Sequence, residues 1–195
     1  MANEITELEQ PSLVAAAAAR AREAGFPMSS EPAVGRLLAV LAAQVPAEGR
    51  ILELGTGAGV GTAWIVSGLL PRTDVEVLTV ERDPRTAALA ALGDWPSFVE
   101  LRRGDALDVL AQTDGTFDLI FADAPEGKWH GLDRTIAALA PRGLLIVDDM
   151  TPRPDWTDSH RAAQEQVRQT LLTAPELTSV ELGHGSGVIL SARAS

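Results

Sequence analysis

The chain contains no cysteine, so a disulfide, a thiolate zinc site and a cysteine nucleophile are all excluded. No apolar run approaches the length of a membrane span, and we expect no association with a membrane. The alanine run 15–19 is short and is followed at once by Arg20. Acidic residues precede it where a signal peptide has a basic region, namely Glu4, Glu7 and Glu9. A signal peptide is therefore not expected, and a cytoplasmic location is the default prediction.

Basic residues are also few. The 16 lysines and arginines are outnumbered by 27 acidic residues, and the formal net charge is −11. Proteins hold the phosphate backbone of nucleic acids mainly with Lys and Arg, and the arginines here are scattered along the chain. We therefore expect a small-molecule ligand and no nucleic-acid partner.

Apolar residues, in contrast, are plentiful. They make up 46% of the chain and charged residues 22%, which is typical of soluble globular proteins. A chain of 195 residues is ample for one domain and short for two ordinary ones. We predict a single domain over residues 1–195, in which N-terminal helices at 1–46 precede an α/β core at 47–195.

Short apolar segments alternate with helical segments along this core. Helices are predicted at Ser12–Ala24 and from Ser30 to just before Pro46, ahead of the first strand. The alternation favours right-handed βαβ units and a Rossmann-like, doubly wound, mostly parallel sheet with helices on both faces. Ligands of such sheets bind beyond the carboxyl ends of the strands. The predicted strands cover residues 50–54, 75–80, 98–101, 117–122 and 144–147, and an antiparallel C-terminal hairpin at 178–182 and 187–192.

The segment RILELGTGAGVG, residues 50–61, runs from an apolar strand through a glycine-rich turn into a helix. Glycines permit positive φ and close approach of a ligand, and a helix N-terminus offers free N–H groups, so the turn predicts a ligand cradle. A nicotinamide-type fingerprint needs a third glycine where Val60 or Thr62 stands, which weakens the dinucleotide interpretation. Tight strand-to-helix packing is the alternative use of such a turn. The segment instead matches the pattern Glu-x-Gly-x-Gly-x-Gly, on Glu53, Gly55, Gly57 and Gly59.

Acidic side chains follow four of the predicted strands: Glu53, Glu81, Asp123 and the pair Asp148-Asp149. A carboxylate after a buried strand is costly to desolvate unless something pairs with it, so a shared ligand is indicated. Glu81, at the end of the second strand, is positioned to accept both hydroxyls of a ribose. The alternative is a solvated carboxylate beside a helix that Asp83 caps.

The third strand is followed by Gly104, Asp105 and Ala106. Here the carboxylate of Asp105 is positioned for an adenine amino group, or the N–H of Ala106 for a ring nitrogen. An ordinary turn with a helix cap is the alternative.

Asp123, Asp148 and Asp149 follow two strands that are neighbours in the expected sheet, about 4.8 Å apart. Like charges at this range hold a proton or recruit a cation, and carboxylate oxygens suit a hard divalent ion. The sequence therefore predicts a metal site on these three residues. The alternative is that Asp123 begins a turn before Pro125, that the other two carboxylates face water, and that Lys128 neutralises the group.

These motifs together resemble the class I S-adenosylmethionine-dependent methyltransferases. The closest resemblance is to the cation-dependent O-methyltransferases, the group of catechol and caffeoyl-CoA O-methyltransferases. It rests on the glycine-rich motif, Glu81, the Gly104–Ala106 turn, FDLIFADA across Asp123 and LLIVDDM across Asp148-Asp149, and it extends over nearly the whole chain. The resemblance implies a seven-stranded sheet with an antiparallel last strand.

The resemblance also implies S-adenosylmethionine and a divalent cation as cofactors, with Mg²⁺ the expected ion and Mn²⁺ and Ca²⁺ as alternatives. The N-terminal helices would cap the cofactor site, and Met28 and Ser29 would close over cofactor and substrate. The metal ligands are implied to be Asp123, Asp148 and Asp149, with Asp123 also at the cofactor. The remaining cofactor-binding residues are Glu53, Gly55, Thr56, Gly57 and Gly59 toward the methionine end, Glu81 and Arg82 at the ribose, and Gly104, Asp105 and Ala106 at the adenine.

Two positions depart from the family pattern. The family holds its metal with Asp, Asp and Asn, whereas the third position here is Asp149, which adds a negative charge. The family's lysine falls on Lys128, which Ala-Pro-Glu-Gly separates from Asp123. A plain surface lysine is the alternative.

The resulting hypothesis is transfer of the sulfonium methyl group to a hydroxyl of a small-molecule acceptor, with the cation lowering the pKa of that hydroxyl. Lys128 and Asp123 are the predicted catalytic residues, Lys128 as general base or electrostatic partner, with His130 as its substitute. Trp129 and Trp156 are predicted to line the acceptor or cover the adenine, and core packing is the alternative for both.

Rival hypotheses are a metal-independent or N-directed methyltransferase of the same fold and a non-catalytic cofactor-binding or interaction protein. The sequence specifies neither the acceptor nor the oligomeric state. The alanine-rich first helix makes a homodimer one expectation.

Overall fold

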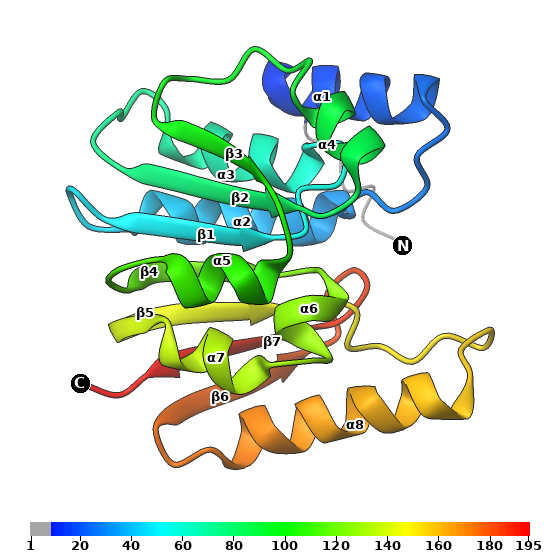
Figure 1. Ribbon diagram of the computed structural model, residues 1–195, viewed down its shortest axis with the longest axis vertical. Coiled ribbons are helices and arrows are strands. Elements are labelled where there is room, and N and C mark those ends of the chain that lie inside the picture. The colour runs from blue at the N-terminus through cyan, green and yellow to red at the C-terminus, as the bar shows by residue number, and fades with distance from the viewer. Residues whose placement is uncertain (1–8) are drawn as a thin grey trace, which may run out of the picture.

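The computed structural model describes residues 9–195, so Glu4 and Glu7 lie outside the described residues. Seven strands form one sheet in the order β3-β2-β1-β4-β5-β7-β6 (Figure 1). The strands are β1 (Arg50–Leu54), β2 (Glu76–Glu81), β3 (Val99–Arg103), β4 (Phe117–Ala122), β5 (Leu139–Val147), β6 (Leu177–Leu182) and β7 (Val188–Arg193). The helices are α1 (Ser12–Glu23), α2 (Pro32–Ala43), α3 (Val60–Leu69), α4 (Pro84–Ala90), α5 (Ala106–Gln112), α6 (Pro125–Lys128), α7 (Leu132–Ala137) and α8 (Asp158–Thr173).

The strand pairing follows the doubly wound pattern. β1 pairs in parallel with β2 and β4, β2 with β3, and β4 with β5. β7 runs antiparallel to both β5 and β6. The chain first builds outward from β1 to β3 and then returns to place β4 on the other side of β1, so the strand order reverses between β1 and β4. The predicted seven-stranded, mostly parallel sheet with an antiparallel C-terminal hairpin is confirmed.

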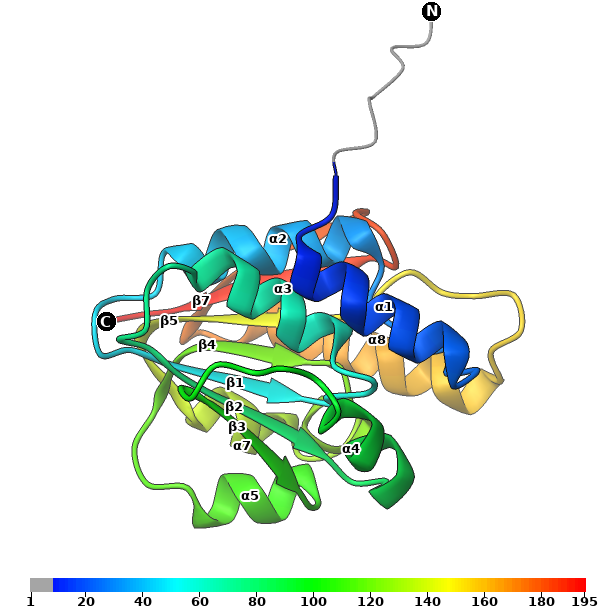
Figure 2. The same ribbon diagram turned by 90° about the horizontal axis from the view of Figure 1, so that it is seen from above.

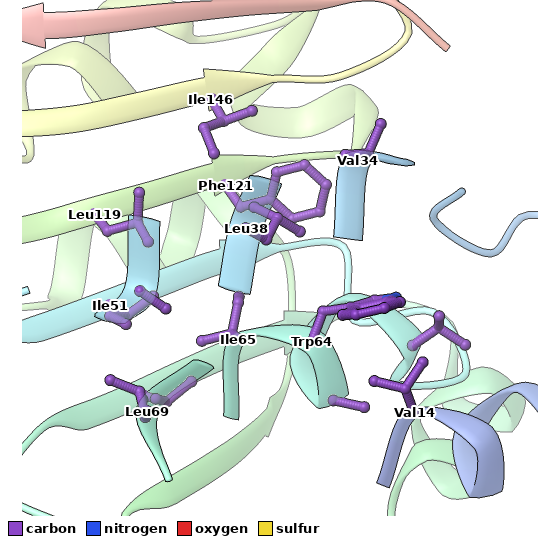
Figure 3. Close-up of a cluster of buried hydrophobic side chains, with 14 of the residues drawn as sticks. Val14, Val34, Leu38, Ile51, Trp64, Ile65, Leu69, Leu119, Phe121 and Ile146 are labelled. Atoms are coloured by element: carbon purple, nitrogen blue, oxygen red, sulfur yellow. The ribbon is translucent and has the colours of Figure 1, made fainter. Parts of the chain in front are cut away.

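Helices cover both faces of the sheet (Figure 2). On one face α1, α2 and α3 pack over a cluster that includes the fully buried Leu38, Ile65 and Phe121 (Figure 3). On the other face α5, α7 and α8 contribute side chains such as Ile136 and Leu171. Because the central strands are buried on both faces, their sequences are continuous apolar runs interrupted only where function or hydrogen bonding requires a polar residue.

Local sequence signals explain where two of the helices begin. α2 begins with Pro32 in its first turn, and α4 begins with Pro84 directly after Asp83. The carboxylate of Asp83 accepts hydrogen bonds from the backbone N–H groups of Arg85 and Thr86. Proline in the first turn costs no helical hydrogen bond, and the cap satisfies two N–H groups that the helix leaves free.

One strand boundary differs from the sequence prediction. β5, predicted over residues 144–147, begins at Leu139, which pairs with Phe117 at the amino edge of the sheet before a bulge that absorbs Pro141 and Gly143. The short helix α6 follows β4. Among residues 9–195, no helix is both long and apolar enough to cross a membrane.

Candidate functional site

The glycine-rich turn links β1 to α3 at the carboxyl edge of the sheet. Gly55, Gly57 and Gly59 have φ values of 102°, 55° and 88°, which residues with a side chain rarely adopt. A Cβ at Gly55 would lie 2.7 Å from the carbonyl oxygen of Asp123, so the turn packs directly on the end of β4. The N–H groups of Gly55 and Thr56 both donate to the carbonyl oxygen of Val80. The predicted cradle therefore lies at the point where the strand order reverses.

The segment between α1 and α2 lies beside this turn. A Cβ at Gly57 would be 3.1 Å from the ring of Phe26 and 3.8 Å from the carbonyl oxygen of Met28. The Met28 side chain is exposed, and so is Ser29. The backbone of Met28 thus stands next to the turn, and the side chains of Met28 and Ser29 are open to solvent. Phe26, which packs closer to the turn, had no signal in the sequence.

Two more side chains that the sequence did not reveal border the far end of the turn. The guanidinium of Arg20 donates from Nη2 to the carbonyl oxygen of Ala58 at 3.1 Å and lies 5.9 Å from the centroid of the Trp95 ring. A Cβ at Gly59 would be 2.7 Å from that same ring. α1 and the loop after α4 bring these groups together only through tertiary packing, so no local motif marks them.

Glu53 is fully buried beneath the first turn of α3. Its Oε2 accepts hydrogen bonds from the hydroxyls of Thr62 and Thr79, whereas Oε1 has no partner among the described residues. Burial raises the pKa of Glu53 to about 7, although the two hydroxyls lower it. Glu53 therefore lies under the turn and joins β1 to β2 and α3.

Glu81 supports the turn from the end of β2. Its Oε2 accepts from the N–H of Gly57 at 3.0 Å, and its Oε1 accepts from the N–H of Asp83 at 2.8 Å. Arg82 is largely exposed and forms an ion pair with Glu126 of α6. Glu81 thus contacts the glycine turn directly, whereas Arg82 reaches across the edge to α6.

The predicted adenine segment lies beside Glu81. The N–H of Gly104 donates to the carbonyl oxygen of Glu81 at 3.0 Å. Asp105 is the N-cap of α5, and its carboxylate accepts from the N–H of Leu107 at 2.9 Å. Ala106 is buried at the start of the helix. The structure thus brings these three residues to the same corner as Glu81, with the Asp105 carboxylate serving as a helix cap.

Lys128 is the only lysine in the chain and is buried, with 2% of its side chain exposed. Its Nζ donates to Asp149 Oδ2 at 2.8 Å and to Asp123 Oδ1 at 3.3 Å, and it lies 4.7 Å from the centroid of the Trp129 ring. Burial lowers the pKa of the ammonium, but the charges of Asp123 and Asp149 outweigh it and the pKa is raised overall. The alternative of a plain surface lysine is therefore wrong. His130, its predicted substitute, is exposed.

The three aspartates gather at the ends of β4 and β5, but they do not converge on one point. Asp148 is buried, and its Oδ1 accepts from the hydroxyl of Ser186 and from the N–H of Asp149. Burial raises the pKa of both Asp123 and Asp148. Within residues 9–195, no three acidic or histidine side chains are arranged to hold a metal ion. The divalent cation is therefore not confirmed. Lys128 pairs with Asp123 and Asp149, as the alternative has it, but Asp148 is buried and does not face water as that alternative expected.

An aromatic cluster borders Lys128. The His160 ring stacks on Trp156 with centroids 4.1 Å apart and planes 10° apart, and it meets the Trp129 ring edge-on at 5.3 Å. The Nε2 of His160 is buried without a hydrogen-bond partner among the described residues. Trp129 and Trp156 thus come together through α8, which no sequence pattern foretold, and one of them contacts the predicted catalytic lysine.

Comparison with known proteins places this edge in context. Residues 52–150 match the family model described as a methyltransferase domain. A candidate O-methyltransferase of Mycolicibacterium vanbaalenii is 32% identical to this chain over 202 residues. The match covers 95% of this chain and 86% of that protein. The catechol O-methyltransferase of Niastella koreensis is 37% identical over 150 residues, or 72% of this chain and 66% of its own.

A solved structure extends the likeness to three dimensions. The O-methyltransferase TomG of Streptomyces achromogenes, crystallised with S-adenosylmethionine, matches with a TM-score of 0.79 and 25% identity over 97% of this chain and 93% of its own. The matched family region contains the glycine-rich turn, Glu81 and the Asp123–Lys128–Asp149 cluster. The chain therefore belongs to the class I S-adenosylmethionine-dependent methyltransferases and, among them, to the O-methyltransferases.

Proposed function

We propose that the chain methylates a hydroxyl of a small, planar acceptor bound at the carboxyl edges of β4 and β5. The observation that carries the proposal is the buried ammonium of Lys128, held between Asp123 and Asp149. Asp123 also adjoins the glycine turn, because its carbonyl oxygen occupies the space that a Cβ at Gly55 would need. A positive charge is thus fixed next to the predicted cofactor cradle, where an acceptor oxygen develops negative charge.

S-Adenosylmethionine suits the residues of the β1–β3 side. The positive φ values at Gly55 and Gly57 leave the backbone of the turn uncovered by side chains. Glu81 accepts one N–H at each oxygen, and each oxygen keeps a lone pair for a ribose hydroxyl. Asp105 and Ala106 would adjoin the adenine, and Met28 and Ser29 would cover the turn.

The cofactor supplies the reactive group. When bound, it offers an electrophilic methyl whose bond to sulfur breaks as the acceptor oxygen takes the methyl and loses its proton, leaving a neutral thioether. The chain's own residues contribute position and charge.

Lys128 acts as an electrostatic partner rather than as a general base. Its carboxylate neighbours raise its pKa, so the amine is protonated near neutral pH. A protonated amine cannot accept the proton of the acceptor hydroxyl. Asp123 and Asp149 hold the ammonium in place, which lets it stabilise an oxyanion without reorganising. The acceptor's proton leaves to water on the open side, where the Asp149 side chain is 40% exposed.

The aromatic cluster supports a planar acceptor. Trp129 contacts the Lys128 ammonium with its ring, and His160 and Trp156 continue the wall. Flat apolar faces beside a fixed charge favour an aromatic ring that carries a hydroxyl. The relative named catechol O-methyltransferase agrees with such an acceptor.

A divalent cation does not fit the arrangement of the aspartates. The Asp148 carboxylate is engaged by Ser186 and by the backbone, and Lys128 lies between the other two carboxylates. The proposed methyl transfer therefore involves no metal.

The proposal is tested by incubating the full chain with S-adenosylmethionine and two matched panels, aromatic diols and the corresponding aromatic diamines, and by identifying methylated products by mass spectrometry. We expect O-methylated products and little transfer to nitrogen. Transfer to the diamines alone, or cofactor binding in a calorimeter with no transfer to any hydroxyl, would contradict it.

A further inference from the structure

The acceptor side of the edge carries its own cation. Lys128 is the single lysine among 16 basic residues, and every other one is an arginine. It is also among the largest fully buried side chains of residues 9–195. A buried ammonium is costly unless carboxylates pair with it, and here Asp149 and Asp123 do so at 2.8 and 3.3 Å.

The backbone around Lys128 holds it in this position. Gly127, immediately before it, has a φ of 90°, donates its N–H to the carbonyl oxygen of His130 at 2.7 Å and accepts from the hydroxyl of Thr135 at 2.8 Å. A Cβ at Gly127 would lie 2.4 Å from the Leu54 side chain, so only glycine lets this turn pack against β1. Four residues separate Asp123 from Lys128, more than in the family pattern. They form a tight turn that brings the lysine back to Asp123.

The carboxylates are oriented by the protein for an ammonium rather than for a divalent ion. Asp149 has a φ of 60°, and its carbonyl oxygen accepts from the buried Gln164 at 3.0 Å, which directs its carboxylate to Lys128. The Asp148 carboxylate instead accepts a hydrogen bond from the hydroxyl of Ser186, in the loop before β7. A hard divalent ion needs several oxygens converging at about 2 to 2.6 Å, which these side chains do not provide together.

We propose that the Lys128 ammonium takes the place that a divalent cation holds in cation-dependent O-methyltransferases, so that this chain needs no metal for methyl transfer. An ammonium has three N–H donors, and two point to Asp123 and Asp149. In this proposal the third donates to the acceptor oxygen. The inference rests on the proposed function, because it assigns the charge that the methyl transfer uses.

The single lysine makes a direct test practical. Protein labelled with ¹⁵N-lysine gives one Nζ signal, which we follow while Mn²⁺ is added to the full chain. We expect this signal to be neither broadened nor shifted beyond the effect of bulk Mn²⁺. Activity with the best acceptor should be equal after dialysis against EDTA and after addition of Mg²⁺. Selective broadening of the Nζ signal at low Mn²⁺ concentration, or activity that EDTA abolishes and Mg²⁺ restores, would overturn the inference.

A substitution provides a second, activity-independent test. Lys128→Met removes the ammonium and frees two carboxylates, so Mn²⁺ affinity measured by electron paramagnetic resonance should rise at least about tenfold over the unsubstituted chain. Arg72→Met is the matched control, because it removes one positive charge from an exposed pair with Asp74 and should leave Mn²⁺ affinity unchanged. Equal Mn²⁺ affinity in the unsubstituted chain and in Lys128→Met contradicts the inference.

The two failures are distinguishable. If no acceptor is methylated under any condition, the proposed function fails, and the Nζ signal still reports whether a metal displaces Lys128. If methylation occurs and requires Mg²⁺, the proposed function stands and the inference alone fails.

Discussion

The two halves of the carboxyl edge differ in the partners that their acidic side chains find. At the ends of β1 and β2, Glu53 and Glu81 accept hydrogen bonds from threonine hydroxyls and backbone N–H groups, all of them uncharged donors. At the ends of β4 and β5, Asp123 and Asp149 are met by the ammonium of Lys128. The acids of the first half therefore meet no cation, whereas in the second half Lys128 cancels part of the negative charge.

The difference matches what each half is proposed to bind. A sulfonium cofactor is a cation, and carboxylates with neutral partners still attract it. An acceptor hydroxyl becomes negatively charged as it reacts, and a nearby ammonium stabilises that charge. The same pattern, an acid after a buried strand, thus serves opposite purposes on the two sides.

The largest expected effect comes from removing the charge on the acceptor side. Lys128→Met should lower kcat about 10²- to 10³-fold, because one preorganised charge next to the reacting oxygen is lost. The affinity for S-adenosylmethionine, measured by calorimetry, should change little, because the β1 and β2 contacts remain. Lys128→Arg keeps the charge and controls for misfolding, since breaking a buried pair costs about 3 to 5 kcal/mol. A loss of cofactor affinity as large as the loss of kcat would erase the distinction between the halves.

On the cofactor side, Glu53 should make the free energy of unfolding depend on pH. The pKa of Glu53 is about 7 in the folded chain, against an ordinary value of 4.5 for a glutamate, so between these values the folded state holds a proton that the unfolded chain has released. Its contribution to stability is therefore lost as pH rises from about 4.5 to 7, by about 3 kcal/mol in total. Glu53→Gln keeps acceptors for Thr62 and Thr79 but does not titrate.

Urea unfolding of the unsubstituted chain and of Glu53→Gln at several pH values measures this difference. The difference in the free energy of unfolding, Glu53→Gln minus the unsubstituted chain, should rise as pH goes from about 4.5 to 7 and stay constant at higher pH. Parallel pH profiles for the two proteins would show that Glu53 is ionised in the folded state.

A smaller effect is expected where the two halves touch. Gly55→Ala adds a Cβ 2.7 Å from the carbonyl oxygen of Asp123 at a φ of 102°, so either the turn or the end of β4 must shift. We expect a loss of about 1 to 3 kcal/mol in the free energy of unfolding, together with weaker cofactor binding. Gly183→Ala is the control, because a Cβ there meets nothing within 4 Å. Equal stability of the two variants would show that the turn is not tightly packed on β4.

Much of the cofactor half could be predicted from the sequence, because its signals are local. The glycines between β1 and α3, and Asp83-Pro84 after Glu81, each act within a few residues of their own position. Glu53 was the exception. It was predicted at the ligand, and only the packing of α3 over β1 places its carboxylate under the turn, where Oε1 has no partner among residues 9–195.

The acceptor half could be predicted only as a gathering of acids. Parallel strand order brings Asp123 near Asp149, and the sequence signal for that order was strong. Whether a metal or Lys128 lies between them depends on a single turn at Gly127 and on a positive φ at Asp149, neither of which has a pattern that periodicity detects. The stacking of Trp156 on His160 was likewise invisible, because it joins a loop to the first turn of α8.

The smallest effect we predict separates the charge of Glu81 from its shape. Glu81→Gln keeps an oxygen for the N–H of Gly57 but turns an NH2 group toward the N–H of Asp83, so the turn should retain its form while the free energy of unfolding falls by about 1 kcal/mol. The ribose hydroxyls would lose a charged acceptor, and the cofactor would lose an attracting carboxylate, so its affinity should fall about tenfold while kcat at saturating cofactor stays within about twofold. Glu76→Gln, at the opposite, exposed end of β2, should alter neither. If Glu81→Gln lowered kcat as strongly as Lys128→Met, charge on the cofactor side would act on the chemical step itself, and the division of the edge into a half that binds and a half that stabilises the reacting oxygen would not hold.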